Sequence, residues 1–320
     1  MPNYNHEKYL KQRLESVFNQ TYHNFEVILL DDCSRDNSRT ILSEYTKNPK
    51  TSHCIFNETN SGNTFKQWAK GISLTKGDLI WIAETDDYCD INFLEKLVQP
   101  FQKDPEVVLA YCQSNRVNER GEATGNWITH TEDLDATLFL NDFTIDSNEF
   151  IEKFLIFKNV IPNASAVVFR KNAVDINLHF DIDPLFKYCG DWMFYFKLII
   201  NKKNAFVSES LNNFRFHSQS VIAGAIQTEK RVSIIDIDFE MRQKMIDFLR
   251  KQKISNFKTI ARNNTKIKKE LKYEKAIYYF SNNSKLKGAF ILVSILDVFI
   301  KKYKLKKKLK IKFHNIFKSI

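Results

Sequence analysis

The chain has 320 residues, enough for one large domain or two smaller ones, and its 43% hydrophobic and 27% charged content is typical of a globular protein. Its five cysteines are widely spaced without a C-x-x-C pair, which favours neither a disulfide framework nor a structural zinc site. The net charge of +10 conceals an acidic part, residues 1–220 with net charge −7, and a basic part, residues 221–320 with net charge +17. We therefore expect the two parts to meet different partners.

Helix and strand patterns alternate through the first 112 residues. Apolar residues at helical spacing predict a helix over 7–18, and the run FEVILL at 25–30 predicts a buried strand. Further helices are predicted at 38–47, 64–77 and 91–101, and further strands at 53–58, 78–83 and 107–112. Strands separated by helices predict an α/β fold with a mostly parallel sheet covered by helices on both faces.

The periodicity weakens from residue 113. The stretch 114–135 predicts a long loop, and residues 147–157 and 190–200 predict helices. Closing strands are expected at 165–170, 205–209 and 211–217, and everything after about residue 225 has a helical pattern. We accordingly expect two domains, residues 1–225 and a helical, basic extension at 226–320.

Two predicted strands end in acidic side chains. Asp31 and Asp32 follow the strand at 25–30, and Glu84, Asp86 and Asp87 follow the strand at 78–83. Open α/β sheets bind ligands beyond the carboxyl ends of their strands, and clustered carboxylates repel one another unless a hard cation such as Mg²⁺ or Mn²⁺ joins them. The pattern indicates a metal–diphosphate site, although the spacing alone also fits a solvated acidic turn that caps the next helix.

The motifs and their order resemble those of glycosyltransferase family 2, the inverting nucleotide-sugar transferases of GT-A fold. The matching segments are PNYN (2–5), NQTY (19–22), VILLDDCSRDNS (27–38), GDLIWIAETDDY (77–88), NASAVVFR (163–170), GDWMFYFKL (190–198) and FRFHSQS (214–220). They cover residues 1 to about 220. The resemblance implies a GT-A sheet and an enzyme that moves a hexosyl or N-acetylhexosaminyl group from a nucleotide-diphosphate sugar to an acceptor hydroxyl.

By position, the resemblance assigns several residues to the nucleotide. Tyr4 would stack on the base, and Asp32, beside Asp31, would accept a hydrogen bond from the imide N–H of the base. Asp86 would also contact the ribose. Lys66, in the helix whose start approaches the donor, is a weaker candidate for a phosphate contact.

The segment ETDD stands where the family has its Asp-x-Asp signature. Asp86 and Asp87 would bind a divalent metal, Mg²⁺ or Mn²⁺, and through it the diphosphate. Glu84 occupies the position that the family usually gives to the first Asp, and its longer side chain leaves open which carboxylate touches the metal. His217 would join the metal or the diphosphate; a surface histidine after a strand is the alternative.

Asp191, at the start of the helix at 190–200, matches the family's catalytic base. It would take the proton of the acceptor hydroxyl that attacks the anomeric carbon as the nucleoside diphosphate leaves from the opposite face. Without the resemblance, a first-turn acid favoured by the helix dipole is the simpler interpretation. Asn163, Ser165 and Trp192 are candidate acceptor contacts, and for Trp192 a place in the core is the alternative.

The two ends of the chain carry further expectations. Family members usually begin with an apolar strand that leads into the P-x-Y-N segment, so we expect the natural chain to carry additional residues before Met1. Near the other end, GAFILVSILDVFI at 288–300 is too short to span a bilayer, and eight lysines follow within 301–312. This combination favours contact with an anionic membrane surface through 288–318, ahead of a solvated tail or nucleic-acid binding.

No signal peptide is evident in MPNYNHEKYL. We therefore expect a cytoplasmic protein, peripheral at the inner face of the cytoplasmic membrane, that acts on a growing surface glycan or a lipid-linked oligosaccharide. Three alternatives remain open. A nucleotidyltransferase would usually carry a Gly-rich phosphate loop after the first strand, and a receiver-like domain would need Thr/Ser and Lys partners on later strands. A degenerate transferase would bind the nucleotide sugar without catalysis.

Overall fold

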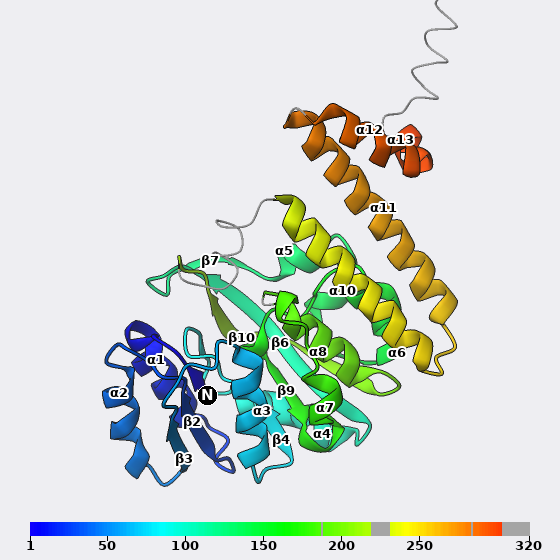
Figure 1. The fold of residues 1–320 in the computed structure, drawn as a ribbon. Helices are drawn as coiled ribbons and strands as arrows, with labels where there is room; N and C mark the ends of the chain where they lie inside the picture. The colour runs from blue at the N-terminus through cyan, green and yellow to red at the C-terminus, as the bar shows by residue number, and fades with distance from the viewer. Residues whose placement is uncertain (187, 219–230, 283, 303–320) are drawn as a thin grey trace, which may run out of the picture. The chain divides into compact units, whose positions relative to one another are not determined.

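A computed structural model describes residues 1–186, 188–218, 231–282 and 284–302 of the chain (Figure 1). The chain forms two compact units, Met1–Gly224 and Ala225–Ile320. The first unit is built on two β-sheets. The described part of the second unit is helical.

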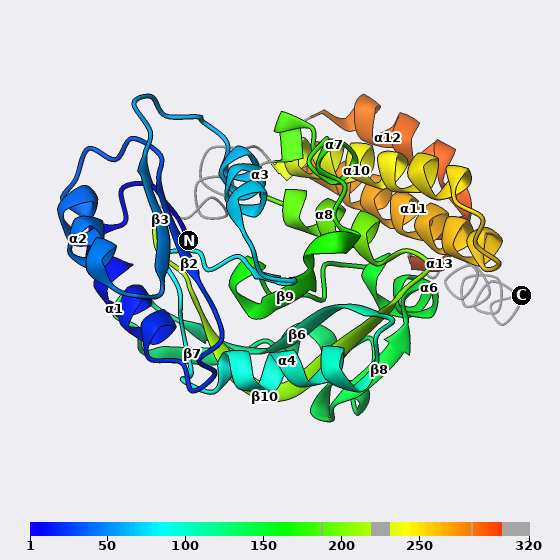
Figure 2. The ribbon, with the colours of Figure 1, turned by 90° about the horizontal axis from the view of Figure 1, so that it is seen from below.

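The small sheet contains three parallel strands in the order β1 (Pro2–Asn3), β2 (Val27–Asp31) and β3 (Thr51–Phe56). Helices α1 (Glu7–Phe18) and α2 (Ser38–Glu44) cover one face and α3 (Thr64–Leu74) covers the other (Figure 2). Successive side chains of a strand point to opposite faces, so Leu29 joins the core beneath α1 while Leu30 lies against Gly71 of α3. Asn3 is paired with Asp31, so the loops after β1 and β2 leave the sheet at the same edge.

The large sheet has seven strands. Its main path runs β4 (Leu79–Trp81), β9 (Val167–Arg170), β6 (Val107–Val117), β10 (Lys203–Arg215), β5 (Tyr88–Cys89), with β7 (Ala123–Asn126) on β6 and β8 (Phe143–Asp146) on β10. Helix α4 (Phe93–Lys103) packs on one face and α8 (Gly190–Ile199) on the other (Figure 2). The core beneath α4 joins the apolar residues of that helix, Phe93 and Leu97 among them, to residues of β6, β9 and β10.

The prediction of an α/β fold with helices on both faces is confirmed, whereas the pairing in the large sheet differs from the mostly parallel sheet that the sequence predicted. Only β6 and β10 pair in parallel there; every other pair in the large sheet of the described chain is antiparallel. Local alternation of helices and strands indicates the sequence order of the elements, but the direction in which a strand enters a sheet depends on long connections. About 40 residues, β8 among them, lie between β7 and β9 in the chain. After them, β9 pairs antiparallel with both of its neighbours, β4 and β6.

Two other expectations are corrected. The stretch 114–135 is not one loop, because β6 continues to Val117 and turns back as β7 before α5 (Ile128–Thr131). The two expected closing strands are a single strand, β10, with irregular pairing between Val207 and Asn212. The remaining short elements are η1 (Tyr45–Lys47), η2 (Leu138–Leu140), α6 (Ser147–Phe150), the π-turn η3 (Ile151–Leu155), η4 (Ala164–Ala166), η5 (Lys171–Ala173), α7 (Ile176–His179) and η6 (Pro184–Phe186).

The second unit contains α10 (Arg231–Lys251), α11 (Phe257–Ser281), α12 (Lys285–Ser294) and α13 (Leu296–Lys302). Helix α12 packs on α11 through Gly288, where a Cβ atom would lie 2.8 Å from the ring of Phe280. Its other face exposes Leu286, Phe290 and Val293, which are 79%, 77% and 72% accessible. Within the described chain, no helix combines the length and apolarity that crossing a bilayer requires. Most of the predicted lysine-rich contact, residues 303–318, lies outside the described residues.

Candidate active site

A cavity of about 640 Å³ opens in the first unit. Its walls come from the loops after β1, β2 and β4, from the start of α3, from the start of α8 and from the end of β10. Of the residues that the sequence singled out, the cavity wall includes Tyr4, Asp32, Glu84, Asp86, Asp87, Asn163 and Asp191. The two acidic strand ends therefore converge on one cavity, together with the acidic start of α8.

Asp31 and Asp32 are neighbours in sequence but differ in environment. Asp31 is fully buried, and its carboxylate accepts hydrogen bonds from the side chain of Asn3, the N–H of Ser34 and the Nε of Arg39, each at 2.9 to 3.0 Å. Burial raises the pKa of Asp31, but these hydrogen bonds outweigh it and hold the pKa below its ordinary value. Asp31 is absent from the cavity wall, so its place is that of a support for the loops after β1 and β2.

Asp32 lies on the cavity wall and holds the loop that precedes α3. Its carboxylate accepts from the side chains of Asn57 and Gln67 and from both the N–H and the hydroxyl of Ser61, at 2.7 to 2.9 Å. A carboxylate offers about four acceptor positions, so these donors use its capacity fully. A ligand N–H that contacts Asp32 must displace one of them.

Four other predicted residues have different positions. Tyr4 is 42% exposed and forms part of the cavity wall. Lys66 is exposed on α3 and is not on that wall. Ser165 is fully buried behind the acidic turn, where its hydroxyl accepts from the N–H of Glu84 at 3.2 Å. Trp192 is buried, and its indole N–H donates to the carbonyl of Leu155 at 3.0 Å, so it belongs to the core.

The three carboxylates of the turn after β4 point to different partners. Glu84 accepts a hydrogen bond from the indole N–H of Trp68 at 2.7 Å. Burial, followed by the charge of Asp86, raises the pKa of Glu84 to about 8.

Asp87 is buried and fastens the turn to β10. Its carboxylate accepts from the N–H of Arg215 at 2.9 Å and from the side-chain amide of Asn163 at 2.6 Å. Asn163 in turn accepts from the amide of Asn212 at 3.1 Å. Burial and the charge of Asp86 raise the pKa of Asp87. Asn163, which the sequence suggested as an acceptor contact, thus orients Asp87 while reaching the cavity wall.

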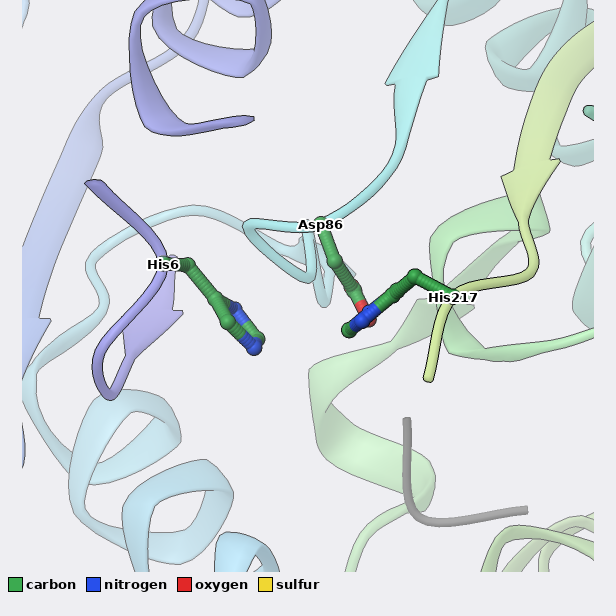
Figure 3. Close-up of side chains that lie close together, drawn as sticks. All are labelled: His6, Asp86 and His217. Atoms are coloured by element: carbon green, nitrogen blue, oxygen red, sulfur yellow. The ribbon is translucent and has the colours of Figure 1, made fainter. Parts of the chain in front are cut away.

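Asp86 lies between two histidines (Figure 3). One possible ligand atom from each of His6, Asp86 and His217 lies within 4.8 Å of the others, and the Nε2 of His217 is 3.2 Å from the Oδ2 of Asp86. Burial raises the pKa of Asp86, but the hydrogen bond from His217 and the charges of both imidazoles lower it below its ordinary value. Glu84 and Asp87 are not members of this group. Imidazole nitrogens and a carboxylate oxygen are ligands that suit Mn²⁺ and other first-row divalent ions, so the donor set fits the metal that the sequence predicted.

Asp191 lies in the first turn of α8, at the cavity wall. Its Oδ1 accepts the N–H of Trp192 at 2.7 Å. Burial raises the pKa of Asp191 to about 6, against the lowering effect of the hydrogen bonds from the Trp192 N–H and Asn159. A carboxylate with this pKa is ionised at neutral pH and is still basic enough to accept a proton from a ligand hydroxyl.

Several residues of the cavity were not found from the sequence. His6 is the third member of the group of possible metal ligands. The sequence feature that could have pointed to it is its position two residues after Tyr4, in a loop predicted to lie where the nucleotide binds. Tyr188 and Phe214 add aromatic surface to the wall. Gly190 leaves room for the ring of Phe65, because a Cβ atom there would lie 2.5 Å from that ring. Only the folded chain brings these segments together.

Sequence comparison gives one family match and several relatives. The family model described as "Glycosyl transferase family 2" matches residues 1–163, just over half of the chain. The chain is 38% identical over 110 residues to "Glycosyltransferase GlyG" of Streptococcus pneumoniae, covering 34% of this chain and 36% of the relative. It is 32% identical over 98 residues to "Putative teichuronic acid biosynthesis glycosyltransferase TuaG" of Bacillus subtilis, covering 31% of this chain and 38% of the relative. These matches thus span little more than a third of either curated relative.

Solved structures share the fold. Staphylococcus aureus TarS 1–349 in complex with UDP-GlcNAc superposes with a TM-score of 0.64 at 17% identity, over 94% of this chain and 79% of that one. The mannosyltransferase PcManGT from Pyrobaculum calidifontis, in complex with GDP-Man and Mn²⁺, gives a TM-score of 0.58 at 12% identity, over 95% of this chain and 78% of that one. At such identities the likeness concerns the fold alone, and it confirms the GT-A-type architecture that the resemblance implied.

Proposed function

The chain belongs to glycosyl transferase family 2, and from this premise we propose that it transfers a hexosyl or N-acetylhexosaminyl group from a nucleotide-diphosphate sugar to an acceptor hydroxyl, with inversion and with the help of a divalent cation. The observation that carries the proposal is the single cavity on which Tyr4, Asp32, Asp86 and Asp191 converge. Tyr4 and Asp32 would bind the nucleotide base of the donor. Asp86 would bind the cation, and Asp191 would act as the general base.

In the donor complex, the ring of Tyr4 would stack on the nucleotide base, and Asp32 would exchange one of its present donors for the imide N–H of the base. Asp86 and His217 would hold the cation, which neutralises the charge that develops on the leaving diphosphate. The structural relatives support a nucleotide-sugar donor, since those named above were solved with UDP-GlcNAc and with GDP-Man and Mn²⁺.

Asp191 is the proposed general base. The acceptor oxygen forms a bond to the anomeric carbon while the bond from that carbon to the diphosphate oxygen breaks, and the hydroxyl proton moves to a carboxylate oxygen of Asp191. Attack from the face opposite the leaving group inverts the configuration. The N–H of Trp192 holds one carboxylate oxygen at 2.7 Å and so fixes the orientation of the base.

We further propose that the acceptor is a glycan of the cell envelope, met at the inner face of the cytoplasmic membrane. Two relatives support this acceptor class by name, TuaG and a "Poly(ribitol-phosphate) beta-glucosyltransferase" of Bacillus spizizenii. The exposed apolar face of α12, with exposed lysines at Lys285 and Lys287 beside it, supports contact with an anionic membrane surface.

The proposal is tested by a panel of nucleotide sugars with the purified full chain. We expect thermal stabilisation and slow hydrolysis by at least one nucleotide sugar in the presence of Mn²⁺, and loss of both with EDTA. Asp86→Ala should lose both effects, while Glu44→Ala, which removes an exposed carboxylate of α2, should keep them. Indifference of the wild-type chain to every nucleotide sugar would overturn the proposal, and nucleotide binding without turnover would leave a binding protein in its place.

A further inference from the structure

Hydrogen bonds hold the backbone around His6 in place. His6 is the N-cap of α1, and its carbonyl accepts hydrogen bonds from the N–H groups of Tyr9 and Leu10 at 2.9 and 3.0 Å. Asn5, in the left-handed region at φ 56°, donates its N–H to the hydroxyl of Ser34 at 2.9 Å. The imidazole therefore projects from a rigid turn, as a ligand must if it is to hold a cation in a defined place.

The hydrogen bonds of His6 also determine which ring nitrogen is free. Thr85 is fully buried, and its hydroxyl donates its hydrogen to the carbonyl of Pro2 at 3.2 Å. The hydroxyl oxygen must then accept from the Nδ1 of His6, which lies 2.8 Å away. This assigns the hydrogen to Nδ1 and leaves a lone pair on Nε2. A metal-bound histidine usually donates its other ring N–H in this way.

The imidazole of His217 is buried and only partly hydrogen-bonded. The residue is 3% exposed, and its Nδ1 has no hydrogen-bond partner among the described residues. Its Nε2 lies 3.2 Å from the Oδ2 of Asp86, a hydrogen bond of the metal-free protein that binding of a cation by both groups would replace. The ring of Tyr9 packs against both imidazoles, with centroids 6.2 Å from His6 and 5.0 Å from His217. The two rings are thus held across from each other with Asp86 beside them (Figure 3).

We infer that His6 is a third protein ligand of the cation. The inference rests on the proposed metal-assisted function and makes it more specific. Imidazole nitrogen and carboxylate oxygen both bind first-row divalent ions, and Mn²⁺ is the ion used as the probe. A site with two imidazole nitrogens and one carboxylate oxygen also needs no nucleotide to complete a three-ligand set, so the free protein should bind Mn²⁺.

The test measures Mn²⁺ binding to the full chain without nucleotide, from the electron paramagnetic resonance signal of free Mn²⁺. We expect saturable binding of one ion by the wild type, weakened about tenfold or more by His6→Ala and lost in Asp86→Ala. His23→Ala, which removes an exposed histidine away from the cavity wall, is the matched control and should bind as the wild type does. Unchanged binding by His6→Ala would overturn the inference.

A structural role for His6 is separated from ligation by the nitrogen hyperfine couplings of bound Mn²⁺. These should report two imidazoles in the wild type and one in His6→Ala, at ion concentrations that saturate both. Two couplings in the variant would contradict ligation by His6. The readout does not depend on turnover. If the couplings include His6 and no nucleotide sugar binds, the function proposed above fails while the metal site stands; if donor binding needs Mn²⁺ but His6→Ala changes nothing, only this inference fails.

Discussion

The cavity of the first unit and the exposed face of α12 in the second unit are incomplete in opposite ways. In the cavity, a polar group is buried without full satisfaction: His217 has a buried ring nitrogen without a partner among the described residues. On α12, apolar side chains such as Phe290 are exposed to water. Both features cost folding free energy, and each is relieved by a different partner. An ion and a charged ligand suit the first, and an apolar, anionic surface suits the second.

The two regions also differ in net charge. Residues 1–220 carry a net charge of −7 and residues 221–320 a net charge of +17. An anionic donor that enters an acidic cavity needs a cation between the charges, whereas a basic surface attracts anionic lipid directly. Chelators should therefore affect only the first region, and salt should weaken chiefly the second. Four variants or conditions test this division, from the largest expected effect to the smallest.

Replacement of the proposed base should separate binding from chemistry within the cavity. Asp191→Asn keeps the shape of the side chain and the acceptor for the N–H of Trp192, but it cannot accept a proton. We expect transfer to fall by about three orders of magnitude, within the usual range for loss of a general base, while the donor dissociation constant changes less than about threefold. Single-turnover transfer and donor titration provide the two numbers. Turnover near the wild-type rate would show that another group accepts the proton.

Adjacent carboxylates of the acidic turn should differ in what they contribute. Asp87→Ala leaves the N–H of Arg215 and the side-chain amide of Asn163 without their acceptor. We expect the free energy of unfolding to fall by about 3 kcal/mol because two donors then lose their hydrogen bonds. Asp86→Ala should lower the stability of the metal-free protein less, because it removes one hydrogen bond, from the Nε2 of His217, and also removes the charge that raises the pKa of Glu84 and Asp87. Chemical denaturation in EDTA measures both, and equal losses would place the two carboxylates in the same role.

A charge on the apolar face of α12 should affect membrane attachment and nothing in the cavity. Phe290→Glu removes an apolar ring that would insert among lipids and adds a charge that anionic lipid repels, so we expect vesicle binding to weaken by about 2 kcal/mol, or roughly thirtyfold. Co-sedimentation with phosphatidylglycerol vesicles measures it. Leu140→Glu, at an exposed apolar residue of the first unit, is the control and should bind normally. Equal binding by Phe290→Glu would exclude this face as the contact.

The acidic side of the pH profile should report the protonation of Asp191. Its pKa is raised to about 6, so kcat/KM should decline about tenfold per pH unit below 6, as the base becomes protonated. The same shift links to stability: because the folded pKa lies above the unfolded value of 3.8, the stabilising contribution of the protonated group is present below pH 4 and is lost as the pH rises through 6. Asp191→Asn should therefore be more stable than the wild type at pH 8 by about 1 to 2 kcal/mol, with little difference at pH 4. If Asp191→Asn were instead less stable than the wild type at pH 8, the proposed destabilisation of the ionised Asp191 by burial would be wrong.

Part of the cavity wall could be predicted from the sequence. The strand endings at Asp32 and Asp86 and the helix start at Asp191 were predicted because strand and helix ends have local signals, and these residues line one cavity. Lys66, Ser165 and Trp192 were suggested by proximity along the chain to such signals. Their side chains point elsewhere, because a change of one position in a helix or strand turns a residue away from a given face. Nearness in sequence to a cavity residue did not determine whether a side chain faces the cavity.

The amino-acid sequence by itself determined the α/β class, the acidic edge, the basic carboxyl-terminal part and the likeness to a transferase family, because periodicity, charge and motif order are properties of short segments. Tertiary structure alone decided the antiparallel pairing of β9, the different hydrogen-bond partners of Glu84, Asp86 and Asp87, and the closeness of His6 to His217. These depend on contacts between residues that lie far apart in the chain; His6 and His217 come from opposite ends of the first unit. Such contacts arise only when the whole core packs, and no local pattern records them.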